Sequence, residues 1–308
     1  MPHRHAVEEQ AVVEQGTEAA PVQGAPALSN AVVARMSDAD RARALSGASP
    51  HALARSARLL QRNGDGGTSG GGSSTTAAAP PGRGVSTAFG DYWVVPDSTT
   101  VSYPGVTGEQ ITETDFAALE LVWTKLNDGS GQVQITETDD AGTDHAGFKA
   151  KMLVCFGNLM SQPGGRGLVV GLVNGSKTVT IGPTSTRRVA SANRGAGSLE
   201  NADGTAGAGG TTTIRFDADL TDTSIMTFDS AGGEHAAPVW LILGHELIHA
   251  QHNAAGRNRR NLAAVGGAAW GNREEEETIS TGSGLTENAL RAEHGMDPRF
   301  GHGIRDTR

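Results

Sequence analysis

Apolar residues recur at helical spacing in three stretches of the chain: 114–127, 146–160 and 238–256. A spacing of three and four residues places them on one face of a helix, which then packs into a core. In the first stretch Thr114 stands where it could cap the helix. The third stretch begins with Pro238, which suits a first helical turn because its missing N–H costs nothing there. We therefore predict three core-facing helices.

Short segments between these helices have the patterns of strands. Residues 132–138 alternate as a half-buried strand, and 168–173 and 177–181 read as a hairpin across Asn-Gly-Ser. We expect the glycine-rich segment 188–211 to be a long surface loop and 211–216 to be a strand. If 211–216 lies at a sheet edge, it could bind an extended peptide by strand addition.

The first third of the chain differs in composition from the rest. Residues 1–90 are dominated by Ala, Gly, Ser, Glu and Gln, and the run from Gly64 to Gly84 has the composition of a flexible linker. Such a segment buries too little apolar surface to order itself. We therefore expect a disordered leader at 1–90, with short apolar islands where a secretion chaperone could dock, followed by one folded domain at 91–308.

Charge and cysteine content exclude several classes. The formal charge of -9 disfavours nucleic acid as the main partner. Cys155 is the sole cysteine, so no intrachain disulfide can form, which is typical of a reducing compartment. The N-terminus lacks the apolar core of a Sec signal, and no apolar run reaches the length of a membrane span. We expect a monomer without a membrane span that uses another route if it is exported.

The 238–256 stretch also carries candidate chemistry, the motif His245-Glu246-Leu-Ile-His249. The histidines are four positions apart, so both imidazoles lie on one helix face and can reach one metal ion, while Glu246 leans toward a water on that metal. A catalytic zinc takes three protein ligands and keeps one position for water, and a nearby carboxylate can act as general base. The alternative is a core helix with two hydrogen-bonded histidines and a chance match to the motif.

A third ligand must come from elsewhere in the chain. The acidic run Glu274-Glu275-Glu276-Glu277 follows the loop 257–271, and a helix there would direct one or two carboxylates toward the metal. The other acids of the run would be a solvated helix start, which the helix dipole favours. His252 shares a face with the two histidines, but three histidines on one helix fit tetrahedral geometry poorly, so we expect it to have a supporting role.

Three motifs in order, HELIHAQHNAAG, EEEETIS and TENALRAEHG, resemble those of the bacterial type III effector zinc metallopeptidases of the NleD/XopG-like family. The first two are also similar to motifs of the clostridial neurotoxin light chains. The resemblance implies an α+β, zincin-like metallopeptidase domain with a small mixed sheet and an active-site helix. It implies one Zn²⁺ on His245, His249 and Glu275, with Glu274 supporting a ligand histidine. An alignment to an ExxS pattern would instead select Glu277, followed by Ser280.

In the family that the chain resembles, an Arg-x-x-Tyr pair follows the other motifs and stabilises the oxyanion. The matching segment here is Arg299-Phe-Gly-His302, so histidine replaces tyrosine. A histidine can donate a hydrogen bond to an oxyanion, and we assign both residues to the catalytic site. Arg291, in contrast, is expected to pair with a carboxylate and hold the last helix.

These observations predict a zinc-dependent endopeptidase in which Glu246 activates the zinc-bound water. The resemblance implies secretion by a type III-like route into the host cytosol and hydrolysis of host signalling proteins, with a MAP kinase as one possible substrate. Two alternatives stay open. The chain could be a catalytically weak zinc-binding protein that docks to a host target, or it could be the toxin domain of a bacterial competition system.

Overall fold

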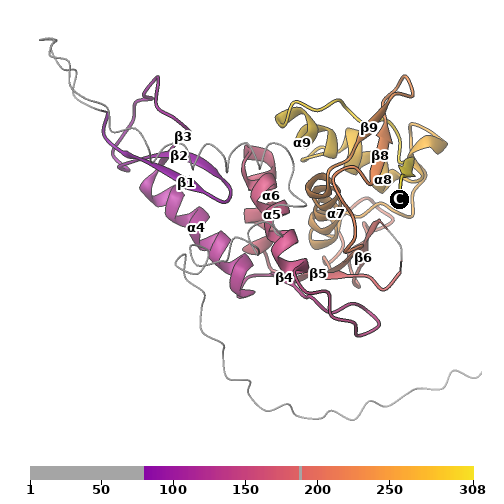
Figure 1. Cartoon of the computed structure of the whole chain (residues 1–308). Helices are drawn as coiled ribbons and strands as arrows, with labels where there is room; N and C mark the ends of the chain where they lie inside the picture. Colours follow the sequence, from indigo (N-terminus) through magenta and orange to yellow (C-terminus); the bar gives the residue numbers. More distant parts are fainter. Residues whose placement is uncertain (1–79, 187–188) are drawn as a thin grey trace, which may run out of the picture. The chain divides into compact units, whose positions relative to one another are not determined.

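The computed structural model describes residues 80–186 and 189–308 (Figure 1). The disorder and the chaperone docking expected for the leader fall largely on residues 1–79, outside the described residues. Strand β1 (Arg83–Thr87) pairs antiparallel with β2 (Gly90–Val95). Regular structure thus begins before residue 91, inside the segment 1–90 assigned by composition to the leader. The side chains of β1 are mostly exposed, so the strand depends on its pairing with β2 and leaves little trace in the hydrophobic pattern.

The first predicted helix is α4 (Glu113–Asp128), and it follows β3 (Glu109–Thr112), which pairs parallel with β2. The expected apolar stripe is buried at Phe116, Leu119, Val122 and Leu126. The cap, however, is Thr112 instead of Thr114. The Thr112 hydroxyl accepts a hydrogen bond from the Asp115 N–H at 3.1 Å, while Thr114 donates to Asp97 at 2.6 Å.

The main sheet has the order β4-β5-β7-β6. Its strands are β4 (Val133–Ile135), β5 (Val179–Pro183), β7 (Thr212–Phe216) and β6 (Ala190–Arg194). The first three run parallel, whereas β6 pairs antiparallel with β7. The segment 211–216 is a strand, as expected, but it lies inside the sheet. The edge position that strand addition at 211–216 would need is therefore not met, and one edge of the sheet is β6, within the segment expected to be a loop.

The predicted hairpin over 168–181 was also wrong. Residues 163–173 form helix α6 (Pro163–Val173), which has Pro163 in its first turn and packs on α5 (Phe148–Met160). Strand β5 then runs parallel to both of its neighbours. An apolar run of this length fits a strand and a helix equally well, because its exposed positions Gly167 and Gly171 are glycines and no polar residue marks the helical period.

Helix α7 (Val239–Ala254) is the third predicted helix, and it contacts α5, α6, α9 (Glu287–Glu293) and β6. Every residue from 239 to 250 is buried. The carboxylate of Asp222 accepts the Val239 N–H at 2.9 Å and so serves a free donor at the start of the helix. The helix ends at Ala254, and Gly256, two residues later, has a φ of 66°, the left-handed conformation that glycine adopts without strain.

The C-terminal elements close over α7. They are the 3-10 helix η1 (Ala268–Trp270), α8 (Arg273–Glu276), the π-helix η2 (Glu277–Thr281) and α9 (Glu287–Glu293). A second sheet of order β10-β8-β9 comprises β8 (Ile225–Phe228), β9 (Glu234–Ala236) and β10 (Ile304–Asp306). The mixed α+β architecture agrees with the expected fold class. Across the described part of the chain, none of the helices has the length and apolar character needed to cross a membrane.

Candidate metal centre

Helix α7 presents His245 and His249 side by side on the face turned toward α8. Their Nε2 atoms lie 3.1 Å apart, and both residues are 7% exposed. The rings are nearly perpendicular, with centroids 4.7 Å apart. Two imidazole nitrogens in this arrangement converge on one point beside the helix, as the spacing of the motif predicted.

Glu275 from α8 completes a triangle with the two histidines. Its Oε2 atom is 3.2 Å from His245 Nε2 and 3.2 Å from His249 Nε2. Asn272 caps α8 by accepting the Glu275 N–H at 3.1 Å, which fixes the backbone of this residue. These three residues form a group that could hold a metal ion.

The size of the triangle can be compared with that of a tetrahedral zinc site. Metal–ligand bonds of about 2.0–2.1 Å at the tetrahedral angle place neighbouring ligand atoms about 3.3–3.4 Å apart. The three separations of 3.1, 3.2 and 3.2 Å are slightly below this range. The donor set of two imidazoles and one carboxylate is one that catalytic zinc sites use. The residues present therefore fit a zinc ion.

Each histidine is contacted by a carboxylate at Nδ1, the ring nitrogen that points away from the triangle. The Nδ1 atom of His245 lies 2.9 Å from Glu287 Oε2, and that of His249 lies 2.8 Å from Glu274 Oε1. A hydrogen bond at Nδ1 leaves Nε2 as the lone-pair donor and fixes the ring. Glu274 thus has the supporting role that the resemblance implied. Glu287 was missed as a site residue, although the motif that contains it had been singled out.

The charges of the site depend strongly on one another. Burial disfavours ionised Glu275, but the two adjacent histidines hold the pKa of its carboxyl well below the usual range. The pKa of Glu274 falls to about 2, because hydrogen bonds from His249 and His252 outweigh its burial. Burial lowers the pKa of His249, yet the neighbouring carboxylates raise it overall. The carboxylates thus favour the protonated form of both histidines, and a metal ion would compete with those protons.

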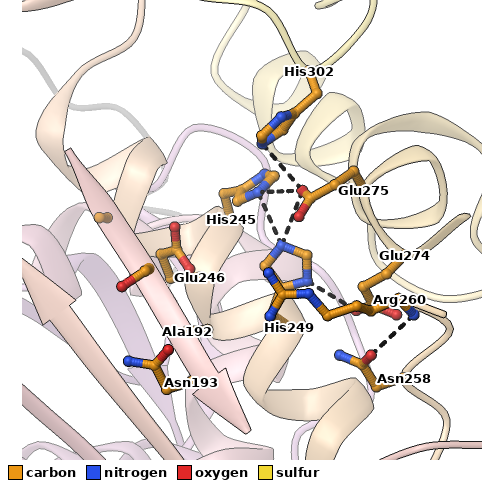
Figure 2. Close-up of a pocket in the computed structure, with 12 residues that line it drawn as sticks. Ala192, Asn193, His245, Glu246, His249, Asn258, Arg260, Glu274, Glu275 and His302 are labelled. Carbon is orange, nitrogen blue, oxygen red and sulfur yellow. Dashed lines mark hydrogen bonds and ion pairs between the residues drawn. The ribbon is translucent and has the colours of Figure 1, made fainter. Parts of the chain in front are cut away.

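Glu246 lies on the side of the histidines away from Glu275, beside the edge strand β6 (Figure 2). It is 7% exposed, and its burial raises the pKa of its carboxyl, while the histidines and the Ala192 amide oppose that rise. Together with β6, it lines a cavity of about 230 Å³ that also exposes His245, His249 and Glu275. A carboxyl with a raised pKa next to a metal position is suited to exchanging a proton with a water.

His302 and Arg299 lie differently with respect to the cavity. His302 lines it, half exposed, with Nε2 3.4 Å from Glu275 Oε2, and desolvation lowers its pKa. Arg299 is 7% exposed and turns its guanidinium inward. It donates to Glu287 Oε2 at 2.8 Å and to the carbonyls of Gly301 and His302 at 3.0 and 2.8 Å. Arg299 therefore contacts the site indirectly, by holding Glu287 and the backbone of His302.

The remaining candidates are placed away from the triangle. Glu277 accepts hydrogen bonds from Arg259 at 2.7 Å and from Arg273 at 2.6 Å, so its carboxylate is already paired. His252 Nδ1 lies 2.8 Å from Glu274 Oε1, which gives it the supporting role expected from its helix face. Arg291 pairs with Glu287 at 2.8 Å within α9, as predicted.

Strand β6 is a second part of the site that the sequence did not predict. Its residues 190–193 form one wall of the cavity, and its side facing away from β7 is the edge of the main sheet. The sequence ASANR lacks the bulky apolar side chains that normally identify a strand, and the surrounding glycines favoured a loop. Pairing with β7, not intrinsic propensity, makes this segment a strand.

Comparison with known proteins agrees with this geometry. No curated protein matches the chain significantly. The model of the family Peptidase_M91, described as effector protein, matches residues 136–301, more than half of the 308 residues. The matched segment contains the three residues of the triangle, Glu246 and Arg299, and it ends one residue before His302. The chain therefore belongs to the Peptidase_M91 family of effector proteins.

Proposed function

We propose that the protein is a zinc-dependent endopeptidase with Glu246 as its general base. One observation carries the proposal. Three ligand atoms converge at 3.1–3.2 Å from one another, each histidine is oriented by its own carboxylate, and a buried glutamate with a raised pKa adjoins them. Membership of a peptidase family supports hydrolysis of peptide bonds as the reaction.

The zinc ion and the chain have separate tasks. Held by His245, His249 and Glu275, zinc would act as a Lewis acid and bring the pKa of a coordinating water to about 7. Glu246 accepts a proton from the attacking water as the water oxygen bonds to the scissile carbonyl carbon. The C–N bond then breaks, and Glu246 returns the proton to the leaving amine. The carboxylate ends the cycle in its starting state.

The oxyanion is assigned to His302. Its ring faces the cavity from the side of Glu275, where it can donate a hydrogen bond to a developing negative charge (Figure 2). Arg299 is a positioning residue in this scheme, because its guanidinium is committed to Glu287 and to two carbonyl oxygens. The two residues expected from the sequence thus have different roles. His302 binds the oxyanion, and Arg299 holds the segment that carries His302.

The substrate backbone is proposed to lie along β6. The outer edge of this strand forms the wall of the cavity next to Glu246, where an extended peptide can add as a further strand. A strand that passes along an edge needs no chain end in the site, which favours internal cleavage. In agreement with the effector family, we propose host proteins as substrates, reached by a type III-like route. The resemblance implies a MAP kinase as one such substrate.

A catalytically weak docking protein is the second candidate. It is favoured by the committed donors of Arg299 and by histidine in place of tyrosine at position 302. The experiment that separates the two candidates maps new protein N-termini in host-cell lysate treated with the zinc-loaded protein or with Glu246→Gln. The peptidase proposal expects new termini with the first protein and none with the second. Identical termini in both samples, at equal zinc content, would refute it.

A further inference from the structure

A cluster of three arginines, Arg257, Arg259 and Arg260, follows the metal-binding helix, and its members differ in their partners. Arg259 pairs with Glu200 at 2.8 Å and with Glu277 at 2.7 Å. Arg257, 51% exposed at its side chain, lies 3.6 Å from the same Glu200. The guanidinium of Arg260 has neither a hydrogen bond nor an ion pair to any residue in the described ranges 80–186 and 189–308.

Arg260 also differs from its neighbours in position. It lines the cavity beside the metal centre, and its side chain extends toward that cavity on the side of His249 (Figure 2). Asn193 of β6 and Asn258 line the same end of the cavity. This end therefore has two amides, one cation and the carboxylate of Glu274, whereas the opposite end has His302 (Figure 2).

The backbone that carries Arg260 is held firmly. The Arg260 N–H donates to Asn258 Oδ1 at 3.1 Å, and Asn258 Nδ2 donates to the fully buried Asn253 at 2.9 Å. The Asn258 N–H donates to the Ser198 carbonyl at 3.1 Å, and the Asn258 carbonyl accepts from Glu200 N at 3.1 Å. The direction in which Arg260 leaves the backbone is thus set by a buried side chain and by the neighbouring glycine-rich loop.

Nearby carboxylates do not neutralise this cation. Both oxygens of Glu274 are occupied, one by His249 and His252 and the other by the Arg259 N–H at 2.9 Å. Glu200 is paired with Arg257 and Arg259 of the loop. Glu277 is paired with Arg259 and with Arg273 of α8. A guanidinium in a cavity offers a planar fork of donors that matches a carboxylate or a phosphate group.

We propose that Arg260 determines specificity by binding an anionic side chain of the peptide substrate, within a few residues of the bond that is cleaved. The proposal rests on the peptidase function proposed above. A peptide running along β6 passes Asn193 and so brings one of its side chains to the Arg260 end of the cavity. The anion could be a carboxylate of Asp or Glu or the phosphate of a modified residue, because both offer the same oxygen geometry to the fork.

The test begins with a proteome-derived peptide library cleaved by the zinc-loaded protein. One cleaved sequence is then made in four forms, with Glu, phosphoserine, Gln or Lys at the preferred anionic position. We expect an acidic preference in the library and a kcat/KM about tenfold higher for an anionic peptide than for the Gln peptide. Arg260→Gln should remove that ratio, and Arg260→Glu should shift the preference to Lys. The Glu and phosphoserine arms identify which anion is bound.

Arg257→Gln is the matched control, since it removes a cation from the same loop outside the cavity and should leave the ratio unchanged. Peptide affinity measured in the Glu246→Gln background gives a second readout that does not depend on turnover. A library without acidic preference, or an Arg260→Gln variant that loses activity equally on all four peptides, would overturn the inference. Failure of the wild-type protein to cleave, while the Glu246→Gln variant still selects anionic peptides, would refute the peptidase function and leave the anion site standing.

Discussion

Among the residues that hold the zinc ligands in place, we expect Glu287 to be the one whose neutralisation lowers stability and zinc affinity most. The change is Glu287→Gln. The carboxylate, 2% exposed, accepts hydrogen bonds from Arg291 Nε at 2.8 Å and Arg299 Nη1 at 2.8 Å, and lies 2.9 Å from His245 Nδ1. Glutamine has nearly the same shape but offers one acceptor oxygen and no charge. It would leave two buried guanidinium groups without their counterion.

The expected losses of unfolding free energy and of zinc affinity follow from these contacts. Breaking a buried ion pair by neutralising one partner costs about 3–5 kcal/mol, because the remaining charge stays buried. Urea unfolding of the zinc-free protein measures this as a loss of unfolding free energy at constant m value. Zinc affinity, measured separately, should fall about 10- to 100-fold, because His245 loses the acceptor that orients it.

Glu109→Gln is the control for Glu287→Gln. Glu109 also pairs with an arginine, Arg166, at 2.8 Å, but its side chain is 48% exposed, so its loss should cost no more than about 1 kcal/mol. If Glu287→Gln unfolds no more easily than Glu109→Gln and retains full zinc affinity, the assignment of Glu287 as the support of the site is refuted.

Two further predictions concern the ligands and the oxyanion. Glu275→Ala should lose bound zinc in metal analysis, while Glu277→Ala should retain it, since the Glu277 carboxylate is paired with Arg259 and Arg273; zinc loss in the second variant alone would reverse the assignment. His302→Ala should lower kcat about 10- to 100-fold with one zinc still bound, and unchanged turnover would remove His302 from the reaction.

The sequence was informative where chemistry depends on local spacing. Helix α7 and its two histidines follow from a four-residue interval on a buried helix, and no tertiary information is needed to bring them together. The choice of Glu275 within four consecutive acids came from a resemblance, because spacing along a helix does not tell which carboxylate meets a distant metal. In the structure that choice is made by the Asn272 cap and by the arginines that hold Glu277 away.

Sequence reasoning failed where tertiary contacts override local pattern. The exposed positions of the run GLVVGLV are glycines instead of polar residues, so its pattern could not distinguish the helix α6 from a strand. Strand β6, in contrast, has small and polar residues that do not predict a strand, and it forms one through pairing with β7. Arg299 was placed in the cavity by its motif, but its donors are taken by Glu287 and by two carbonyls from its own segment. None of these partners can be located from the sequence alone.

The central claim, that Glu246 is the base of a zinc peptidase, is tested most directly by the turnover of zinc-loaded Glu246→Gln on a peptide that the wild-type protein cleaves. The carboxylate is not a member of the His245, His249 and Glu275 group, so the variant should bind one zinc per chain with unchanged affinity. We predict that kcat falls about 10²- to 10⁴-fold, the contribution typical of a general base. A variant that binds zinc normally and cleaves the peptide at the wild-type rate would contradict the account.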